Sequence, residues 1–455
     1  TILTTRRLSP KHLNNYNRPK PLPMLYHLFE YFEKANIDFA GSGLMKYISF
    51  RSFGASIIAI LISLIIGHKL IVWLRKKQIG ETIRDLGLEG QLQKKGTPTM
   101  GGIIIIISIL VPVLLFCDLT NINILILILT TVWFGTIGFV DDYIKVFKKR
   151  KEGLNGWYKI ASQVLLGLIV GLIMCFSNEA GFREQKKVAN VAGITSEGIA
   201  VDTAMPAATL NLDTGVLENS TKTTLPFVKD NEFDYGWLSP FGGCFGEYFK
   251  WFIYVCFIIL VITACSNGCN VTDGLDGLAT GVTAIVGATL GIFAYLSGNV
   301  IYSEYLNIMY IPSSAEITVF FSSMVGSLLG FMWYNSYPAQ VFMGDTGSLT
   351  LGGIIGVCAI LVRKELLLPL LCGIFFLESL SVVVQRFYFK YTKKKTGAGV
   401  RVFKMTPLHH HFQKENPDAI IQWPGKVYAE QKVVARFIIV SIILAVLTVV
   451  TLKIR

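Results

Sequence analysis

Charged residues are scarce in this chain. Asp, Glu, Lys and Arg make up 16% of its 455 residues, while hydrophobic residues make up 52%. An ordinary soluble domain carries about 25% charged residues. The composition therefore excludes a typical soluble enzyme and indicates an integral membrane protein. The net charge of +12 does not require a nucleic-acid partner, and we predict none, because Lys and Arg also gather on cytoplasmic loops of membrane proteins.

Cysteine chemistry is also lacking. The eight cysteines form no CxxC pair and no cluster with histidine at zinc-site spacing, so the usual sequence patterns of a zinc or redox site are absent. Most of them lie inside apolar segments, where a free thiol behaves as a small hydrophobic side chain. No secretory signal peptide with a small-residue cleavage site is apparent.

Ten segments are long and apolar enough to cross a bilayer, which takes about 20 residues. We expect them at 53–74, 101–116, 122–140, 160–176, 251–265, 278–296, 317–334, 349–362, 366–389 and 434–452. This pattern predicts an all-α, polytopic membrane protein of about ten transmembrane helices.

Positive charge is distributed unevenly over the loops between these segments. Alternation places the loops at 75–100, 141–159, 266–277, 335–348 and 390–433 on one side, and three of them are rich in Lys and Arg. The loop at 297–316, on the other side, contains neither residue. The positive-inside rule therefore predicts that the five-loop side faces the cytoplasm.

Two stretches differ from the transmembrane pattern. Residues 1–23 are basic, contain proline and lack methionine, so we expect an N-terminal extension upstream of a start at Met24. The transmembrane domain would then comprise 24–455. Residues 177–250 are polar and rich in Thr, Asn and Gly, which predicts an extracytoplasmic insertion that is partly disordered.

Two adjacent carboxylates, Asp141 and Asp142, stand where the apolar segment 122–140 ends. They repel each other and lie near lipid, where charge is costly. One hypothesis is that they serve a divalent cation and a phosphate-bearing substrate. The alternative is a solvated helix end beside Lys145 and the basic run 148–151.

Further polar residues end apolar segments on the same predicted side. One loop carries Asn270, Asp273 and Asp276, and the next carries Asn335 and Asp345. Each aspartate alone could form an Asx turn or cap a helix. Together they predict one active site at the cytoplasmic membrane surface, built for a phosphorylated soluble donor and a lipid acceptor.

Two more loops on this side add cationic and polar groups. Lys94 and Thr99 lie in a Gly-rich stretch whose backbone N–H groups could approach a phosphate, although it could equally be a tight turn before a packed helix. His409, His410 and His411 are contiguous. Their spacing is unlike that of a zinc site and favours substrate contact over a structural role.

Five motifs in order carry a family resemblance: TPTMGG (97–102), DDYIK (141–145), NVTDGLDGLA (270–279), NSYPAQVFMGDTGSL (335–349) and PLHHHF (407–412). With them the chain resembles the polyprenyl-phosphate N-acetylhexosamine-1-phosphate transferases. The unbroken HHHF run is similar to the branch that transfers phospho-N-acetylmuramoyl-pentapeptide. The resemblance covers Met24 to the end, except the insertion at 177–250, which is longer than is typical.

The resemblance implies a reaction and a location. Phospho-MurNAc-pentapeptide would move from UDP-MurNAc-pentapeptide to undecaprenyl phosphate, giving lipid I and UMP in peptidoglycan synthesis, with Mg²⁺ as cofactor. The enzyme would lie in the bacterial inner membrane with its site facing the cytoplasm, and the resemblance leans towards a homodimer.

The resemblance also implies roles for individual residues. Asp345 would be a direct Mg²⁺ ligand with Asp142 close to the metal, and Asp141 would orient or deprotonate the lipid phosphate. Asp273 and His409 to His411 complete the expected catalytic set. The expected substrate-binding residues are Lys94, Thr99, Lys145, Lys159, Asn270, Gly274, Leu275, Asp276, Asn335 and Phe342. Gly274 to Asp276 and Phe342 would form the uridine pocket, with Phe342 stacking on the base.

Two alternatives compete with this interpretation. A sister transferase of the same fold moves N-acetylglucosamine-1-phosphate, but that group typically interrupts the histidine run. An ion-coupled secondary transporter could use Asp141, Asp142 and Asp345. Transporter sites, however, lie near the midplane and often in internal repeats, whereas these acids lie at segment ends and no repeat is visible.

Overall fold

The computed structural model describes Leu25, 42–77, Lys94, 96–148, Arg150, 152–177, 182–183, 217–218, 220–225, 232–306, 308–415 and 418–452. The proposed extension at 1–23 lies outside these residues, and so does most of the insertion.

The described chain is mostly helical, with very little strand. Its long helices are α2 (Ile48–Lys76), α3 (Gly102–Phe116), α4 (Ile122–Phe147), α5 (Gly156–Phe176), α6 (Gly243–Thr272), α7 (Leu278–Ser297), α9 (Ala315–Asn335), α10 (Gly344–Leu361), α12 (Gly373–Thr396) and α14 (Glu430–Thr451). Shorter helices are η2 (Ser42–Lys46), η6 (Tyr235–Leu238), α8 (Val300–Leu306), η7 (Pro312–Ser314), η8 (Glu365–Leu367), α11 (Leu368–Leu371) and α13 (Leu408–His411). The strands form two antiparallel pairs, β1 (Phe182–Arg183) with β2 (Leu217–Glu218) and β3 (Lys222–Thr224) with β4 (Glu232–Asp234).

Every apolar segment expected from the sequence is helical. Within the described residues, eight helices are long and apolar enough to cross a membrane, and a bent pair makes nine. The shorter apolar helix α3, with 15 residues, accounts for the remaining segment. The multi-pass membrane architecture is therefore confirmed, with the count of about ten as an approximation.

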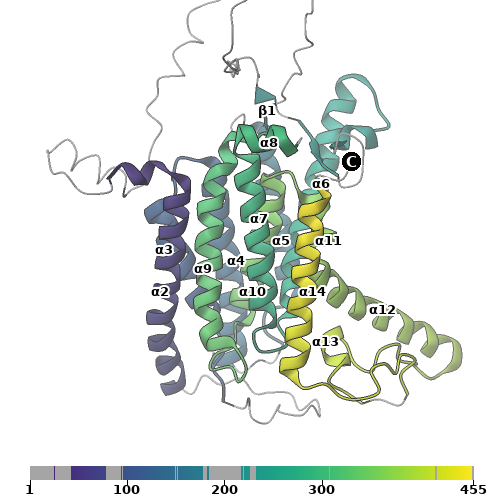
Figure 1. The fold of residues 1–455 in the computed structure, drawn as a ribbon. Helices are drawn as coiled ribbons and strands as arrows, with labels where there is room; N and C mark the ends of the chain where they lie inside the picture. The colour runs from purple at the N-terminus through teal and green to yellow at the C-terminus, as the bar shows by residue number, and fades with distance from the viewer. Residues whose placement is uncertain are drawn as a thin grey trace, which may run out of the picture.

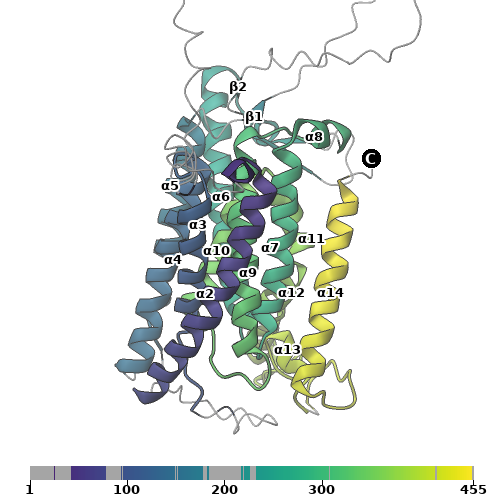
Figure 2. The ribbon, with the colours of Figure 1, turned by 60° about the vertical axis from the view of Figure 1, so that its left-hand side comes forward.

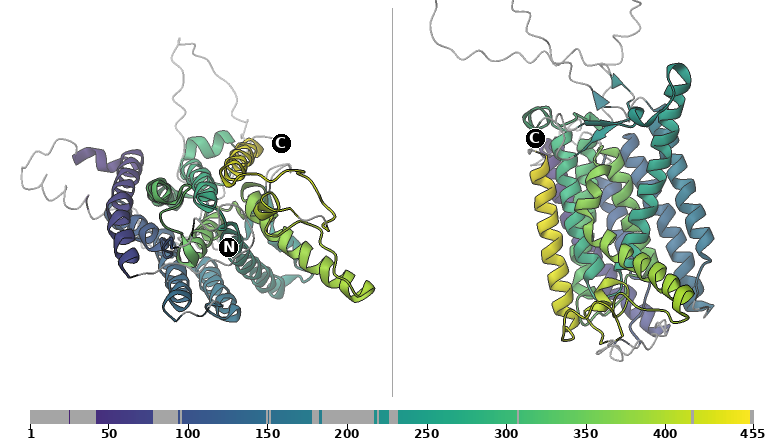
Figure 3. Two further views of the ribbon diagram at one scale, coloured as in Figure 1. Left: turned by 90° about the horizontal axis from the view of Figure 1, so that it is seen from below. Right: turned by 90° about the vertical axis from the view of Figure 1, so that its right-hand side faces the viewer.

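One of the predicted spans is broken. Residues 366–389 form two helices, because the backbone at Cys372 leaves helical geometry with φ −94° and ψ 27°. The two parts meet at 76°, so α12 leans away from the bundle (Figure 1; Figure 3). Periodicity could not show this bend, since both halves are helical.

The bundle is built around α10, which is the most buried of the candidate spans. It packs against α4 on one side and α6 on the other. Asparagines cap two of the surrounding helices. Asn121 accepts a hydrogen bond from the Asn123 N–H at the start of α4, and Asn155 accepts one from the Trp157 N–H at the start of α5. Such caps satisfy backbone donors that have no partner within the helix.

The two ends of the bundle differ. At one end lie α13, the start of α14 and the end of α2, and at the other lie α8, β1 and the end of α14 (Figure 1; Figure 2). The motif-bearing loops follow α6 and α9 and precede α7 and α10, at the same end as α13. The described part of the insertion lies at the opposite end.

The described part of the insertion is anchored to the bundle through the link between α10 and η8. Arg363 accepts a backbone hydrogen bond from Thr224 (3.1 Å), and the Lys364 ammonium donates to Thr224 Oγ1 (2.7 Å). Arg363, Lys364 and Glu365 are all buried. The link between α10 and η8 is therefore the docking point of the β3–β4 hairpin.

Candidate active site

Three aspartates from two helices converge at the α13 end of the bundle. Asp141 and Asp142 lie near the end of α4, and Asp345 lies in the first turn of α10, 203 residues further along. One carboxylate oxygen from each lies within 4.8 Å of the others. Among the residues that the structure describes, this is the one group of three acidic, His or Cys side chains so placed. The predicted convergence of the pair with Asp345 is confirmed.

Asp142 holds the start of α10. Its Oδ2 accepts hydrogen bonds from the Thr346 N–H (2.9 Å) and hydroxyl (2.6 Å), and its Oδ1 accepts one from the Asp345 N–H (3.1 Å). A helix N-terminus leaves such donors without partners and favours a nearby negative charge. The cap that the sequence suggested for Asp345 is thus supplied by Asp142 from another helix.

A glycine makes this contact possible. Gly344 has φ +73°, and a Cβ there would stand 2.6 Å from Asp142 Oδ2. Glycine reaches this left-handed conformation at no steric cost. The GDTG sequence therefore places Asp345 while leaving room for Asp142.

Two lysines neutralise much of the charge. Lys159 lies 2.6 Å from Asp345 Oδ2 and 2.9 Å from Asp141 Oδ1, and Lys145 lies 2.6 Å from Asp141 Oδ2 and 3.2 Å from Asp345 Oδ2. Both lysine side chains keep some solvent exposure. They can therefore meet an anionic ligand without leaving the cluster.

Asn270 extends the cluster towards α6. Its amide donates to Asp345 Oδ1 (3.0 Å) and to Ser348 Oγ (2.9 Å). Asp273 lies at the C-terminal cap of α6 and is not part of the group of three acids. The structure thus places Asn270 beside Asp345, whereas Asp273 ends α6.

A second polar centre lies in the predicted nucleotide region. Lys94 is 2.7 Å from Asp276 Oδ1 and 2.6 Å from Glu430 Oε1, and the Asp276 N–H donates to the same Glu430 oxygen (2.8 Å). The other Asp276 oxygen accepts from the Ala339 N–H (3.0 Å). Asp276 therefore links its own loop to the loop that contains Ala339, and it also pairs with Lys94.

Asn335 has a similar fastening role. Its Oδ1 accepts from the Thr280 hydroxyl (2.7 Å) and the Gly277 N–H (3.2 Å), and its amide donates to the Val341 carbonyl (3.0 Å). These bonds hold the loop before α7 against the loop before α10.

The TPTMGG stretch forms a tight connection rather than an open phosphate loop. The N–H groups of Gly101 and Gly102 donate to the carbonyls of Phe342 and Met343, and the Phe342 N–H donates to the Pro98 carbonyl, each at 2.8 Å. Thr99 is buried beneath this pairing. Of the two possibilities left open by the sequence, the turn before a packed helix is the one observed.

The three histidines occupy different environments. His409 is buried, with Nδ1 3.2 Å from Glu378 Oε2 and Nε2 packed directly on Gly274. His411 is held at both ring nitrogens, by the Lys404 N–H (3.1 Å) and the Trp423 carbonyl (2.7 Å). Burial, with the neighbouring His409, lowers the pKa of His410 to about 3.

Two carboxylates in these contacts were not identified from the sequence. Glu430 begins α14, and Glu378 is a fully buried acid within α12. An isolated acid within an apolar segment is costly and usually functional, and this signal could have drawn attention to Glu378. Glu430 follows a polar loop, so only the fold shows that it reaches Lys94.

Comparison with known proteins identifies the family. The profile of glycosyl transferase family 4 matches residues 223–363, and a phospho-N-acetylmuramoyl-pentapeptide-transferase signature matches residues 94–106. The chain is 54% identical over 435 residues to the phospho-N-acetylmuramoyl-pentapeptide-transferase of Parabacteroides distasonis, covering 95% of this chain and 100% of the relative. With the same coverage it is 53% identical to that of Flavobacterium johnsoniae over 432 residues and 48% identical to that of Bacteroides thetaiotaomicron over 440.

The chain belongs to the phospho-N-acetylmuramoyl-pentapeptide-transferase family. The family signature contains Lys94 and Thr99, and the glycosyl transferase profile contains Asn270, Asp276 and Asp345. The motif resemblance noted in the sequence is thereby confirmed.

Proposed function

We propose that this chain transfers phospho-MurNAc-pentapeptide from UDP-MurNAc-pentapeptide to undecaprenyl phosphate in peptidoglycan synthesis. In net terms, an oxygen of the lipid phosphate bonds to the sugar-bearing phosphorus of the donor, the diphosphate bridge breaks, and UMP leaves. The observation that carries the proposal is the cluster of three aspartates and two lysines at one end of a membrane bundle, in a chain of this family. Phosphoryl transfer depends mainly on positioning and charge neutralisation.

The carboxylate cluster suits Mg²⁺. This ion prefers hard oxygen ligands and keeps several waters, so one or two carboxylates suffice. Asp345 and Asp142 would hold it. Asp142 already accepts three hydrogen bonds, but a carboxylate offers about four lone-pair positions, so one remains. When bound, Mg²⁺ would neutralise charge on the diphosphate and on departing UMP.

The lysines and Asp141 would handle the phosphates. Lys145 and Lys159 each contact both Asp141 and Asp345, so each can turn towards a phosphate while keeping a carboxylate partner. Asp141 is held by the Leu154 N–H (2.7 Å). We assign it the role of orienting the lipid phosphate or accepting its proton.

The remaining loops would bind the nucleotide and the sugar. Lys94, Asp276 and the partly exposed Phe342 lie in connected loops, which supports a uridine site there. Asn270 and Asp273 would complete the polar wall towards the cluster. His410 would contact the UDP-linked substrate through a neutral ring, which can donate or accept a hydrogen bond, since burial keeps its pKa low.

The named relatives favour this function over the alternatives. UDP-N-acetylglucosamine, the substrate of the sister N-acetylglucosamine-1-phosphate transferases, serves as a control. The transporter alternative is disfavoured because transporter sites lie near the midplane, whereas the acids of this chain lie at helix ends at one face of the bundle.

The decisive experiment measures UMP release by the full chain in liposomes with undecaprenyl phosphate, UDP-MurNAc-pentapeptide and Mg²⁺. We expect turnover that requires Mg²⁺ and is not supported by UDP-N-acetylglucosamine. Release of UMP from UDP-N-acetylglucosamine would instead identify the sister activity, and no Mg²⁺-dependent release would refute the proposal.

A matched pair of variants tests the cluster. Asp345→Asn should lower the rate about a hundredfold or more, the usual cost of losing a preorganised charged group. Asp118→Asn changes an acid in the turn between α3 and α4, which accepts from Thr120, and should leave the rate unchanged. Near-normal turnover of Asp345→Asn would remove this residue from the metal site.

We further propose an inner-membrane location with the cluster facing the cytoplasm. This orientation is supported by Lys145 and Lys393 to Lys395, which lie at helix ends on the side predicted to be cytoplasmic. Family resemblance also favours a homodimer, which native mass spectrometry of the purified protein would reveal.

A further inference from the structure

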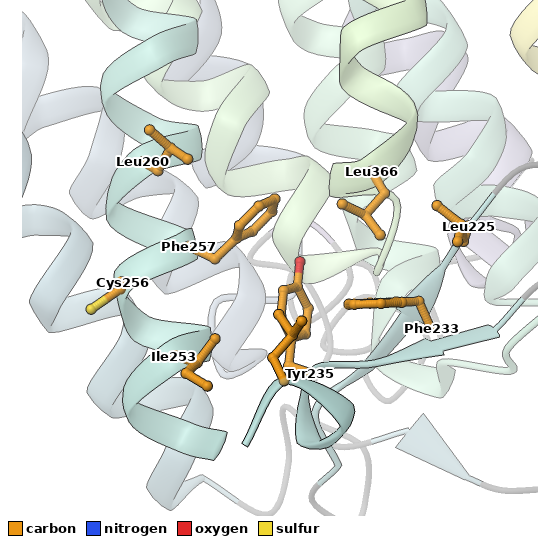
Figure 4. A pocket seen from close by; sticks show the side chains of 9 residues that line it. Leu225, Phe233, Tyr235, Ile253, Cys256, Phe257, Leu260 and Leu366 are labelled. Atoms are coloured by element: carbon orange, nitrogen blue, oxygen red, sulfur yellow. The ribbon is translucent and has the colours of Figure 1, made fainter. Parts of the chain in front are cut away.

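An apolar cavity of about 480 Å³ lies at the insertion end of the bundle, far from the carboxylate cluster. Its walls come from three parts of the chain (Figure 4). The hairpin and η6 contribute Leu225, Phe233 and Tyr235; α6 contributes Ile253, Cys256 and Leu260; and η8 contributes Leu366. Its volume falls within the range of about 300–1,000 Å³ typical of ligand pockets.

The polar groups near the cavity are engaged elsewhere. The Tyr235 hydroxyl is directed to Glu365 Oε1 (3.4 Å), and Arg363 donates to the Tyr254 hydroxyl (2.7 Å). The rings of Phe233 and Tyr235 meet edge to face, with centroids 5.3 Å apart. A water molecule needs two to four polar partners, and the lining offers almost none. The cavity is therefore suited to hydrocarbon and not to water.

The depth of the cavity in the membrane can be read from α6. No charged residue occurs between Lys250 and Asp273, and the intervening helix, at 1.5 Å per residue, is about 33 Å long. This length matches the roughly 30 Å hydrocarbon layer. Ile253 then lies about 4 Å below Lys250 and Leu260 about 15 Å below it. The cavity thus spans one leaflet, from the interface to the midplane.

The cavity is also continuous with the lipid-facing surface of the bundle. Leu260 is 60% exposed and Cys256 is exposed, although both line the cavity. Phe252, one turn before Cys256 on the same helix, is 61% exposed as well. In a bilayer, acyl chains are the solvent for such surfaces.

We propose that the cavity binds one acyl chain of a phospholipid from the leaflet at the insertion end. Its depth matches a chain that begins at the interface beside Lys250 and ends at the midplane. The chain would fill the space between the hairpin and α6, and would thereby help to seat the hairpin over buried Arg363 and Lys364. This proposal requires only the membrane location of the chain and is independent of the transfer reaction.

Native mass spectrometry of the purified full chain tests the proposal. The wild type should retain one phospholipid through mild detergent exchange. Cys256→Trp, which fills the cavity, should reduce that retention about tenfold. Phe252→Trp, on the lipid-facing surface outside the cavity, should not. Equal retention by both variants, or retention of a polyprenyl phosphate in place of a phospholipid, would overturn the proposal.

A second measurement uses the wild type alone and so does not depend on the folding of a variant. Phospholipid carrying a diazirine halfway along one acyl chain is reconstituted with the protein and illuminated. Adducts should map to the hairpin at Leu225 or Phe233 as well as to α6. Adducts spread only over outward-facing residues of the long helices would show ordinary annular lipid. No adduct on the hairpin would equally refute the proposal, including the case in which the insertion itself fills the cavity.

Discussion

Replacing Glu430 with Gln should weaken binding of the nucleotide donor while leaving the chemical step largely intact. One oxygen of Glu430 receives both the Lys94 ammonium (2.6 Å) and the Asp276 N–H (2.8 Å). The Glu430 side chain is 7% exposed and that of Lys94 is 17% exposed, so solvent screens this contact only partly. Glu430 therefore acts as a positioning residue that sets the place of Lys94 relative to the Asp276 loop.

The expected size follows from the contacts. A hydrogen bond to a charged group contributes about 1.5–3 kcal/mol. Gln keeps the shape and one acceptor but loses the charge, and Lys94 retains Asp276 as a partner. We therefore expect a loss in the lower half of that range, which corresponds to a roughly ten- to fortyfold higher KM. A higher KM with unchanged kcat indicates lost uniform binding.

The assay is UMP release at varied donor concentration and saturating undecaprenyl phosphate. Glu415→Gln, an exposed acid in the loop between α13 and α14, serves as the control and should match the wild type. Glu430→Asp should recover part of the affinity, because it restores the charge. The reasoning is refuted if Glu430→Gln changes kcat and leaves KM unaltered, or if both kinetic constants match those of Glu415→Gln.

Three further predictions follow from the ionisable groups and the topology. Burial lowers the pKa of His410 to about 3, so its nitrogen-15 shifts should report a neutral ring at pH 5; a midpoint near 6.5 would contradict the buried geometry. Burial also lowers the pKa of Lys364 from its usual 10.5 to about 8, so the unfolded chain binds more protons between these values and stability should increase with pH across that window. Lys364→Met should lose this increase in a melting-temperature series, and an identical slope would argue against the shift. Cys244, exposed at the start of α6, should react with an impermeant maleimide added to spheroplasts, with Cys244→Ser as the control; labelling only after permeabilisation would reverse the proposed orientation.

Local sequence patterns were sufficient to predict the membrane architecture and the proximity of the three aspartates. Apolar segments of span length are helical because lipid leaves backbone groups no other partner. Charge alternation then placed Asp141, Asp142 and Asp345 on one side, and the structure brings them within 4.8 Å.

The finer arrangement depends on contacts between distant parts of the chain, which local patterns do not encode. The capping of α10 by Asp142 joins residues 203 positions apart. Glu430 accepts a hydrogen bond from the Asp276 N–H, which lies 154 residues earlier in the sequence. The bend at Cys372 separates two segments that are both helical. The sequence left TPTMGG open between a loop that approaches a phosphate and a tight turn before a packed helix, and in the structure its glycines pair with Phe342 and Met343.

The contact between Asp142 and the start of α10 has a consequence for inhibition. The spacing of the carboxylates is set by two packed membrane helices, so it is established before any substrate arrives, and little reorganisation is left for the reaction itself. The same arrangement makes the site sensitive to the packing of α4 against α10. A hydrophobic compound that separated these helices within the bilayer would withdraw Asp142 from Asp345 and stop the reaction. It would do so without competing with either substrate.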